Sequence, residues 1–304
     1  MDLRQLTTFT AVANARGFTR AALALNYAQS SVTAQIQALE EELGVPLFDR
    51  LGHRIALTDA GRRLQVYAAR MLALAEETRA AVTESAEPSG TVAIGVVESL
   101  CTYRLPPLLR AYRQRCPHVQ LLLHSLPISD PWRGLFDGTM DAALNLSETQ
   151  PVPGLEVEPL PRERLVVVAA ADHPLAGAQS VGPADLENEP VLLTEGACGY
   201  RNLFEATLTR AGVTPASTLE FSSVEAIKQC VMAGVGIAVL PEMAVHEELA
   251  HSRLVALRWS EPDFAIGAYF VWHKDKWQSP ALSAFREMVH EVLGVPAVPP
   301  MAAH

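Results

Sequence analysis

The stretch LRQLTTFTAVANARGFTRAALALNYAQSSVTAQIQALEEELGVPLFDR, residues 3–50, decides the fold of the first part of the chain. Apolar residues recur in it at helical spacing and predict a first amphipathic helix, with an inner face formed by Leu3, Leu6, Phe9, Val12 and Ala13. Gly17 breaks this helix, and the hydroxyl of Thr19 is expected to cap a second one. The chain therefore begins with two short helices that pack on a shared apolar side.

A third helix follows the tight connection at residues 26–28 and stops at Gly44. Its inner face is expected to hold Val32, Ile36, Leu39 and Leu43. Two short helices joined by such a turn are typical of a helix-turn-helix. Residues 46–57 then have the pattern of a short β-ribbon with Gly52 near its tip, which is the form of a wing.

A long helix is predicted after the ribbon, because Thr58 and Asp59 can accept hydrogen bonds from the free N–H groups of a first turn. It is expected to reach about residue 84 and to carry apolar residues at near-heptad spacing, at Leu64, Ala68, Met71, Ala75 and Val82. The stripe extends beyond the needs of a small winged domain, so it favours a dimerisation helix over a helix packed only on its own domain. Residues 87–90 end the helix and form a hinge.

From Thr91 onward, strand-like segments alternate with helical ones, as in βαβ units. One series has strands at 91–97, 119–125 and 141–146, and a second has them at 164–170, 190–194, 218–222 and 236–240. A last strand at 265–272 precedes a helix over 279–293. Two series with a return near the end predict a hinged α/β domain of two lobes that resembles periplasmic-binding proteins.

The predicted fold class is α/β, with an N-terminal winged helix-turn-helix and a long linker helix before the two-lobed domain. The first is placed at residues 1–58 and the second at 59–87. The two-lobed domain takes 88–304, with lobe I at about 88–161 and 265–294 and lobe II at about 162–264.

The composition describes a globular chain with a local rather than a general positive charge. Of its 304 residues 49% are hydrophobic, and the net charge is -10, so any surface that binds DNA must be local. The first residues lack the pattern of a signal peptide, and the apolar stretch 231–240 is too short to span a bilayer. We therefore expect a cytoplasmic protein without membrane contact. No metal and no cofactor are expected, since no motif implies them and metal-type spacing is missing from Cys101, Cys116, Cys198 and Cys230.

At this point the residues resemble a known family. The stretch 3–50, followed by ALTDAGRRL at 56–64, is similar, in register and without gaps, to the winged helix-turn-helix of the LysR-type transcriptional regulators. Weaker support comes from GVVESLCTYRLPPLLRAYRQRCPHVQL at 95–121, MAGVGIAVLPE at 232–242 and VWHKD at 271–275. The resemblance implies a regulator that is not an enzyme and that binds double-stranded promoter DNA. It also implies a small-molecule effector, RNA polymerase as a partner, and a homodimer that pairs into a homotetramer.

The third helix is expected to read DNA, because the second helix of a helix-turn-helix enters the major groove. Its outward candidates are Gln29, Ser30, Ser31, Thr33 and Gln37. We favour readout by Gln29 and Thr33, since glutamine can pair with adenine through both amide atoms and threonine can meet a base edge or a thymine methyl. The wing arginines Arg50 and Arg54 suit a minor groove or phosphates. Without the surrounding pattern, the helix residues would be ordinary exposed polar side chains.

The chain departs from the family in this helix. Members often carry Ser at the position of Ala28, and Arg or Lys at those of Ala34, Gln37 or Ala38. Residues 1–63 hold seven arginines against six acidic residues, which leaves a net charge near +1. We therefore expect moderate affinity for DNA with a shallow salt dependence, supported by the avidity of an oligomer.

The effector site is expected beyond the carboxyl ends of strands, where helix N-termini present free N–H groups. One lip holds Ser99, Leu100, Cys101 and Thr102, a second holds Thr194, Ala197, Cys198 and Arg201, and a third holds Ser223. Hydroxyls together with helix N-termini suit a small anion, to which Arg201 would add charge. The serines and threonines can instead be helix caps only.

Three other functions stay open. Cys198 occupies a place that resembles the peroxide-sensing cysteine of the OxyR branch, and pairing with Cys101 would be its form of redox sensing. No second cysteine follows shortly after Cys198, which favours metabolite sensing. A solute-binding protein or enzyme on a two-lobed fold is the alternative of another class, yet the chain carries no GxSxG or HExxH motif and no phosphate loop. A protein that packages DNA is disfavoured by the acidic total.

Overall fold

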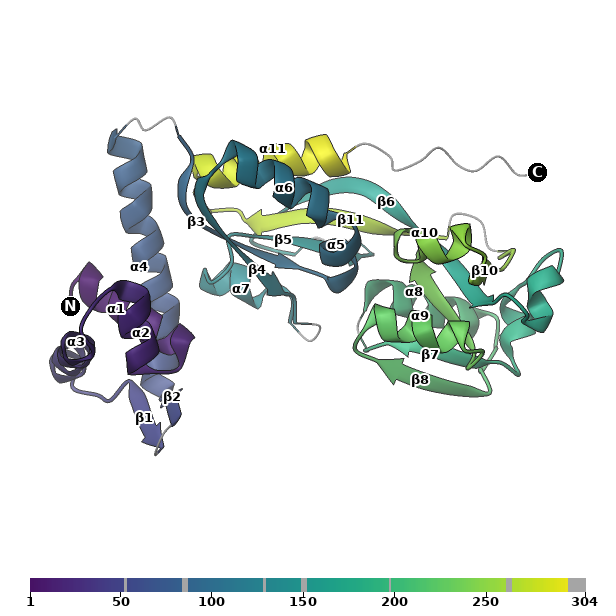
Figure 1. Cartoon of the computed structure of the whole chain (residues 1–304), viewed down its shortest axis with the longest axis horizontal. Helices are drawn as coiled ribbons and strands as arrows, with labels where there is room; N and C mark the ends of the chain where they lie inside the picture. The colour runs from purple at the N-terminus through teal and green to yellow at the C-terminus, as the bar shows by residue number, and fades with distance from the viewer. Residues whose placement is uncertain are drawn as a thin grey trace. The chain divides into compact units, whose positions relative to one another are not determined.

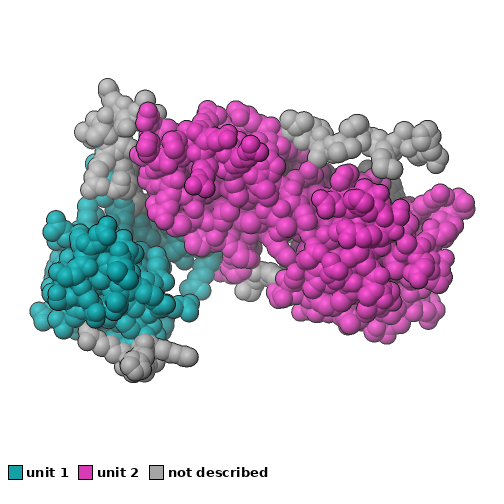
Figure 2. Space-filling model, viewed as in Figure 1, with its two compact units in different colours: residues 1–86, 133–140 teal, residues 87–132, 141–304 magenta. Residues whose placement is uncertain are grey.

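The structure, a computed structural model of the chain, divides by its contacts into two compact units (Figure 2). One unit holds residues 1–86 and 133–140, and the other holds residues 87–132 and 141–304. The described residues are 1–51, 54–83, 87–127, 130–148, 152–196, 198–260 and 264–294.

The first unit is a helical head with a two-stranded ribbon and a long helix (Figure 1). Its elements are α1 (Leu3–Ala15), α2 (Phe18–Leu25), α3 (Gln29–Leu43), β1 (Phe48–Leu51), β2 (Arg54–Leu57), α4 (Asp59–Thr83) and α7 (Arg133–Asp137). A capping box starts α1, because Asp2 accepts from the N–H of Gln5 and the Gln5 side chain accepts from the N–H of Asp2. The apolar faces meet in one core that includes Leu6, Phe9, Val12, Val32, Ile36, Leu39 and Phe48.

Two sequence predictions for the head are wrong in detail. Thr19 does not cap α2, because the chain reverses at left-handed Arg16 and α2 begins directly after Gly17. Leu3 and Leu43 do not face the core but are 40% and 39% exposed, since they stand at helix ends that extend past it. The predicted end of α3 is confirmed, with Gly44 in the left-handed conformation at φ 70°.

The ribbon and α4 are tied to the head through hydrogen bonds to α3 and to the loop before the wing. The Glu40 carboxylate on α3 accepts from the N–H groups of Leu47 and Phe48, at 2.7 and 3.2 Å. As predicted, Thr58 caps α4, since its hydroxyl accepts from the N–H of Gly61 at 3.0 Å. Strands β1 and β2 pair antiparallel, while the predicted tip at Gly52 lies outside the described residues.

The second unit is built on one mixed sheet. Its strands are β3 (Ser89–Val96), β4 (His118–Ser125), β5 (Ala142–Ser147), β6 (Leu155–Ala170), β7 (Pro190–Thr194), β8 (Ser217–Phe221), β9 (Ile237–Pro241), β10 (Leu254–Ala256) and β11 (Ala265–His273). The order is β4-β3-β5-β11-β6-β9-β7-β8, and β10 pairs with β6. The first part of β6 pairs with β11 and its last part with β9 and β10, so this strand joins a lobe around β3–β5 to a lobe around β7–β9.

Helices complete the two lobes. Lobe I has α5 (Glu98–Tyr103), α6 (Leu105–Arg115) and α11 (Pro280–Leu293), with α6 beside α11 (Figure 1). Lobe II has α8 (Gly199–Arg210), α9 (Val224–Met232) and α10 (Glu242–Ala250), and two short 3-10 helices at 174–177 and 183–186. The sequence did not predict α7, α10, β10, the 3-10 helices or the part of β6 before residue 164.

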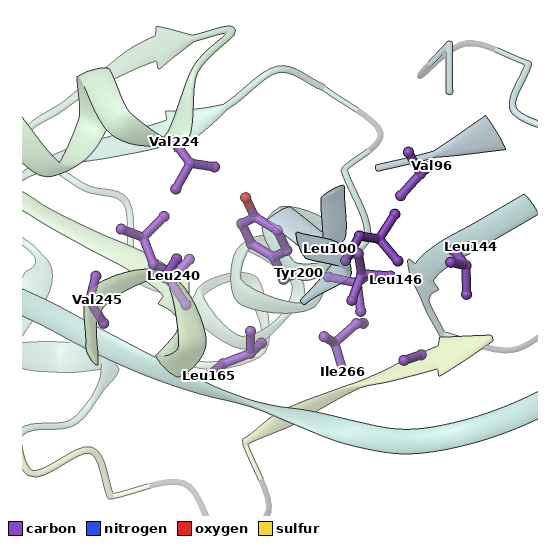
Figure 3. Packing of buried hydrophobic residues seen from close by; sticks show 14 of the residues in the cluster. Val96, Leu100, Leu144, Leu146, Leu165, Tyr200, Val224, Leu240, Val245 and Ile266 are labelled. Atoms are coloured by element: carbon purple, nitrogen blue, oxygen red, sulfur yellow. The ribbon is translucent and has the colours of Figure 1, made fainter. Parts of the chain in front are cut away.

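A single apolar core runs through both lobes. Figure 3 shows Leu100 and Leu146 from lobe I on one side of the Tyr200 ring, with Val224 and Leu240 from lobe II on the other. Because one core serves both lobes, small changes at their junction are felt on each side. Within the described residues, no helix has the length and apolar character to cross a bilayer, and no group of His, Cys, Asp or Glu is arranged to hold a metal ion.

Candidate DNA-binding and effector sites

The outward side of α3 is polar and its inward side is apolar. Gln29, Ser30, Ser31 and Gln37 are exposed, and Thr33 is half-buried. Directly beneath them, Val32, Ile36 and Leu39 are 0% exposed. The N-cap residue Ala28 has no side-chain oxygen to offer the first turn. The structure thus brings the predicted base-reading residues of α3 to one outward surface.

Hydrogen bonds hold two of these side chains in place. The Thr19 hydroxyl on α2 donates to Oε1 of Gln29 at 3.1 Å, while the Thr33 hydroxyl donates to the backbone oxygen of Gln29 at 3.0 Å. Among the described residues the amide nitrogen of Gln29 has no acceptor, whereas the hydroxyl proton of Thr33 is used within its own helix. Sequence reasoning assigned Thr19 to a cap and so missed this contact with Gln29.

For the wing arginines, Arg50 and Arg54, the structure describes the position of the backbone in the ribbon. Arg50 lies opposite Ile55 on the ribbon and Arg54 lies opposite Leu51, but their side chains fall outside the described part of the chain. Arg62, the next cation along the chain, donates to the backbone oxygen of Leu57 at 2.8 Å and forms an ion pair with Asp59. That pairing holds the pKa of Asp59 below its usual value and offsets part of the positive charge near the wing.

The predicted effector residues of the first lip lie on α5 at different depths. Ser99 is 3% exposed, and Leu100, at 1%, is part of the shared core. Cys101 is half-buried and Thr102 is exposed. Leu100 is therefore part of the core, and the polar side chains next to it on α5 are those of Glu98, Ser99 and Thr102.

Tyr200 connects the first lip to the second. Its ring is 4% exposed, and Ser99, Thr194 and Cys198 all lie close enough to its hydroxyl to affect ionisation. Burial raises the pKa of the Tyr200 phenol strongly, a charge on Cys198 raises it further, and the Ser99 hydroxyl lowers it. The phenol is thus a neutral group that can donate and accept. Tyr200 was not among the residues predicted for this site, although its place two residues after Cys198 is a signal for it.

Arg201, expected to bring positive charge to the site, is already engaged. Its guanidinium bonds Glu205 at 3.0 Å and Glu220 at 2.5 Å, and it also donates to the backbone oxygen of Thr194. Burial lowers the pKa of Arg201 and the two carboxylates raise it, with a net rise. Ala197 lies outside the described residues. Arg201 therefore holds the end of β7 at Thr194, and its positive charge is balanced by Glu205 and Glu220.

Two contacts bring the lobes together at these lips. Gly199, the first residue of α8, lies so close to the end of β5 that a β-carbon there would be 2.5 Å from the oxygen of Leu146. Ser223 caps α9 by accepting from the N–H of Ala226 at 3.5 Å, and it also contacts Glu98 of α5. Residues from α5, α8 and α9 thus meet around one junction.

The chain resembles known proteins over almost its whole length. Residues 3–62 match the family described as bacterial regulatory helix-turn-helix protein, lysR family, and residues 85–294 match the LysR substrate binding domain. The chain belongs to the LysR family of transcriptional regulators. It is a DNA-binding transcriptional regulator of the LysR type, and the alternative of an enzyme on a two-lobed fold is not supported, because its curated relatives are regulators.

Individual LysR-type relatives span the chain from end to end. An uncharacterized regulator of Bacillus subtilis, YwqM, is 44% identical over 96% of this chain and 99% of its own, and the regulator GltR of the same species is 34% identical over 94% and 95%. Among solved structures, full-length CbnR in complex with its target DNA has a TM-score of 0.66 at 26% identity, covering 96% of this chain and all of that one (100%). A full-length OxyR variant of Pseudomonas aeruginosa has a TM-score of 0.76 at 22% identity, covers 98% and 99%, and supports the fold.

Proposed function

We propose that this regulator reads promoter DNA through α3 and the wing and responds to a small anionic effector held by α5, α8 and α9. The observation that carries the proposal is the outward polar face of α3 over a fully buried apolar face, on a chain whose remainder is a two-lobed α/β domain. In this proposal residues 1–58 bind DNA, 59–87 link, and 88–304 bind effector in the bacterial cytoplasm.

At the DNA, Gln29 contacts a base edge with the amide nitrogen that Thr19 leaves available. Ser30, Ser31, Thr33 and Gln37 line the same surface, where short hydroxyls and an amide suit base edges and phosphates. The wing residues Arg50 and Arg54 bind the neighbouring phosphates or minor groove. The CbnR complex with its target DNA shows that a relative of this fold binds DNA.

The linker helix α4 forms the homodimer. Of the predicted stripe, Leu64 and Ala68 pack on the core of the head and not on a partner. The side chains of Tyr67, Met71 and Leu74 are instead 60%, 40% and 60% exposed, an apolar row at i, i+4 and i+7 that a second copy of the helix would cover. Paired dimers give a homotetramer, which places several heads on one promoter beside RNA polymerase. Avidity then compensates for the small net charge of each head.

The effector binds where polar groups of both lobes meet, at Ser99, Thr102, Thr194, Cys198 and Ser223. The hydroxyl of Thr194 is buried beside the Tyr200 phenol, so an anionic ligand at this junction can accept hydrogen bonds from both hydroxyl groups. Binding at a junction of lobes stabilises one hinge state, and the linked heads then engage a different spacing on the DNA.

Redox sensing through Cys198 is the second candidate. The four cysteines are free thiols, and burial raises the pKa of Cys101, the predicted partner of Cys198. A raised pKa leaves less of the reactive thiolate, so this observation favours the effector over the thiol switch.

A gel shift with the region upstream of this gene tests the proposal. The full chain should retard that fragment, and replacing Gln29 and Gln37 by alanine should abolish the retardation while an unrelated fragment stays free. Failure of the purified chain to shift any upstream fragment would refute DNA readout. Repeating the shift with peroxide and then reductant separates the candidates, because only the thiol switch predicts a reversible change that Cys198→Ser removes.

A further inference from the structure

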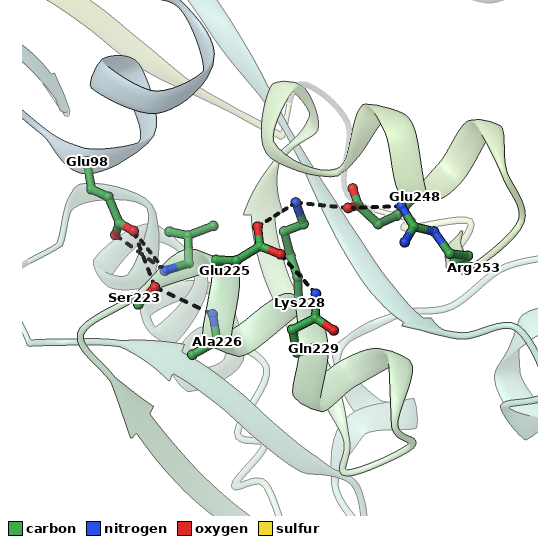
Figure 4. Close-up of polar contacts among 9 residues, drawn as sticks. Glu98, Ser223, Glu225, Ala226, Lys228, Gln229, Glu248 and Arg253 are labelled. Atoms are coloured by element: carbon green, nitrogen blue, oxygen red, sulfur yellow. Dashed lines mark hydrogen bonds and ion pairs between the residues drawn. The ribbon is translucent and has the colours of Figure 1, made fainter.

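A carboxylate from lobe I already occupies the N-terminus of a helix in lobe II. Both oxygens of Glu98, the first residue of α5, accept from the N–H of Val224 at 3.3 Å, and one also contacts the hydroxyl of Ser223 at 3.5 Å (Figure 4). Glu98 follows β3 in lobe I, whereas Val224 opens α9 directly after β8 in lobe II. The contact therefore joins the lobes across 126 residues of chain.

A second contact joins the same two helices. The ammonium group of Lys228 on α9 lies 5.4 Å from the centre of the Tyr103 ring, which ends α5. Lys228 is 4% exposed and is held by Glu225 at 2.9 Å and Glu248 at 3.0 Å (Figure 4). Because these carboxylates hold Lys228 within lobe II, its contact with Tyr103 depends on where α5 lies relative to α9.

The Glu98 carboxylate makes the kind of hydrogen bond at the N-terminus of α9 that a carboxylate effector would make there. Free N–H groups and the positive end of the dipole make a helix N-terminus favourable for a carboxylate. Ser223 offers a hydroxyl at the same place, and Ser99 and Thr102 follow Glu98 on α5. An anionic ligand that reached Ser223 and the Val224 N–H would meet the negative charge of Glu98 there, so the two carboxylates exclude each other.

We propose that Glu98 is an internal anion that latches α5 to α9 in the effector-free protein, and that a carboxylate effector acts by taking its place. This inference rests on the proposed function for the location of the effector site, and it assigns the regulation of that site. The latch makes Glu98 a positioning residue that sets the hinge state, and release of α5 is the change that the effector produces.

Hydrogen–deuterium exchange of the Val224 amide in the full chain tests the latch directly. Glu98→Ala removes the acceptor, so exchange should be at least threefold faster than in the wild type; Glu98→Gln, which keeps an uncharged acceptor, should lie between. Glu247→Gln removes an exposed carboxylate of α10 in lobe II, where Val224 also lies, and should leave the exchange rate of Val224 unchanged. A change smaller than threefold in Glu98→Ala, or an equal change in Glu247→Gln, would overturn the latch.

Acetate serves as the carboxylate probe, with acetamide as its uncharged counterpart. Acetate should slow Val224 exchange in Glu98→Ala in a saturable way, acetamide should not, and the wild type should need a higher acetate concentration. Equal action of acetate on both proteins, or no action on either, would contradict replacement of Glu98. The gel shift is run in parallel: if no protein binds the promoter fragment, the proposed function fails while the exchange data still decide the latch.

Discussion

The outward face of α3 and the junction of α5, α8 and α9 differ in how many hydrogen bonds and ion pairs their polar side chains make within the protein. On α3 the side chains of Ser30 and Gln37 face solvent, and the apolar layer beneath fixes the helix without them. At the junction, Arg201 has three internal acceptors and Ser223 caps α9 while meeting Glu98. Under the proposed function, DNA meets side chains that face solvent, whereas an effector exchanges existing hydrogen bonds and ion pairs for its own. We propose that this exchange couples ligand binding to conformation.

The strongest way to break this comparison is to damage the layer beneath the DNA-binding face. Ile36→Ala should cost about 2–5 kcal/mol of stability, because a fully buried side chain leaves a cavity in the core of the head. All four tryptophans lie in the second unit, so far-UV circular dichroism should show the loss in urea while the tryptophan transition stays in place.

The neighbouring residue supplies the matched control. Gln37→Ala changes the exposed side of the same turn and should leave both transitions unchanged, since exposed polar substitutions cost little. If Gln37→Ala destabilised the head as much as Ile36→Ala, the division of α3 into a supporting face and a reading face would be wrong.

The corresponding change at the junction is Gly199→Ala. A β-carbon there would lie 2.5 Å from the oxygen of Leu146 and 3.0 Å from Cα of Ser147, so backbone of the two lobes must separate, at about 1–3 kcal/mol. The tryptophan transition in urea should move and the head should not. Gly196→Ala is the control, because nothing lies within 4 Å of a β-carbon at that position. Equal effects of the two substitutions would show that the lobes are not in close contact at α8.

The sequence predicted the head more completely than the junction, because the head is specified by signals between near neighbours in the chain and the junction by contacts between distant residues. Periodic apolar residues and the stop at Gly44 are local signals, and they placed α3 within a residue of its observed ends. Most strands of both lobes were also predicted, since they are short apolar runs between turns, but of the long strand β6 only residues 164–170 were predicted. Missed elements such as α10 and β10 lack a strong period or are short.

The partners at the junction could not be predicted, because they depend on residues far apart in the chain. Glu98 meets Val224 across 126 residues, and Arg201 meets Glu220 through the pairing of β7 with β8. A polar residue after a strand indicates that it lies at a strand end, but the partner follows only from the topology of the sheet. The sequence therefore indicated Arg201 as a source of positive charge for the effector site, and the structure shows it paired with Glu205 and Glu220.

A smaller effect is expected from the reading face itself. Gln29→Ala should weaken promoter binding by about tenfold, the scale of about 1–3 kcal/mol for a base contact, with no change in stability. Thr19→Val should reproduce part of the loss, because it removes the hydroxyl that holds Oε1 of Gln29. Fluorescence anisotropy with the promoter fragment measures both, and the control is Gln114→Ala, an exposed side chain on α6. A Gln29→Ala chain that bound as tightly as the wild type would remove Gln29 from the readout.

The smallest effect concerns charge. Since residues 1–63 carry a net charge near +1 and Arg62 is paired with Asp59, few counterions are released per head and the salt dependence of DNA binding should be shallow. Arg50→Ala and Arg54→Ala should each lower the slope of log K against log salt by about 0.9, the share of one phosphate contact. Arg110→Ala, an exposed arginine on α6, should leave the slope unchanged. A steep wild-type slope that neither wing substitution reduces would place the phosphate contacts elsewhere. Positively charged side chains outside residues 1–63 would then have to contact the phosphates beside α3.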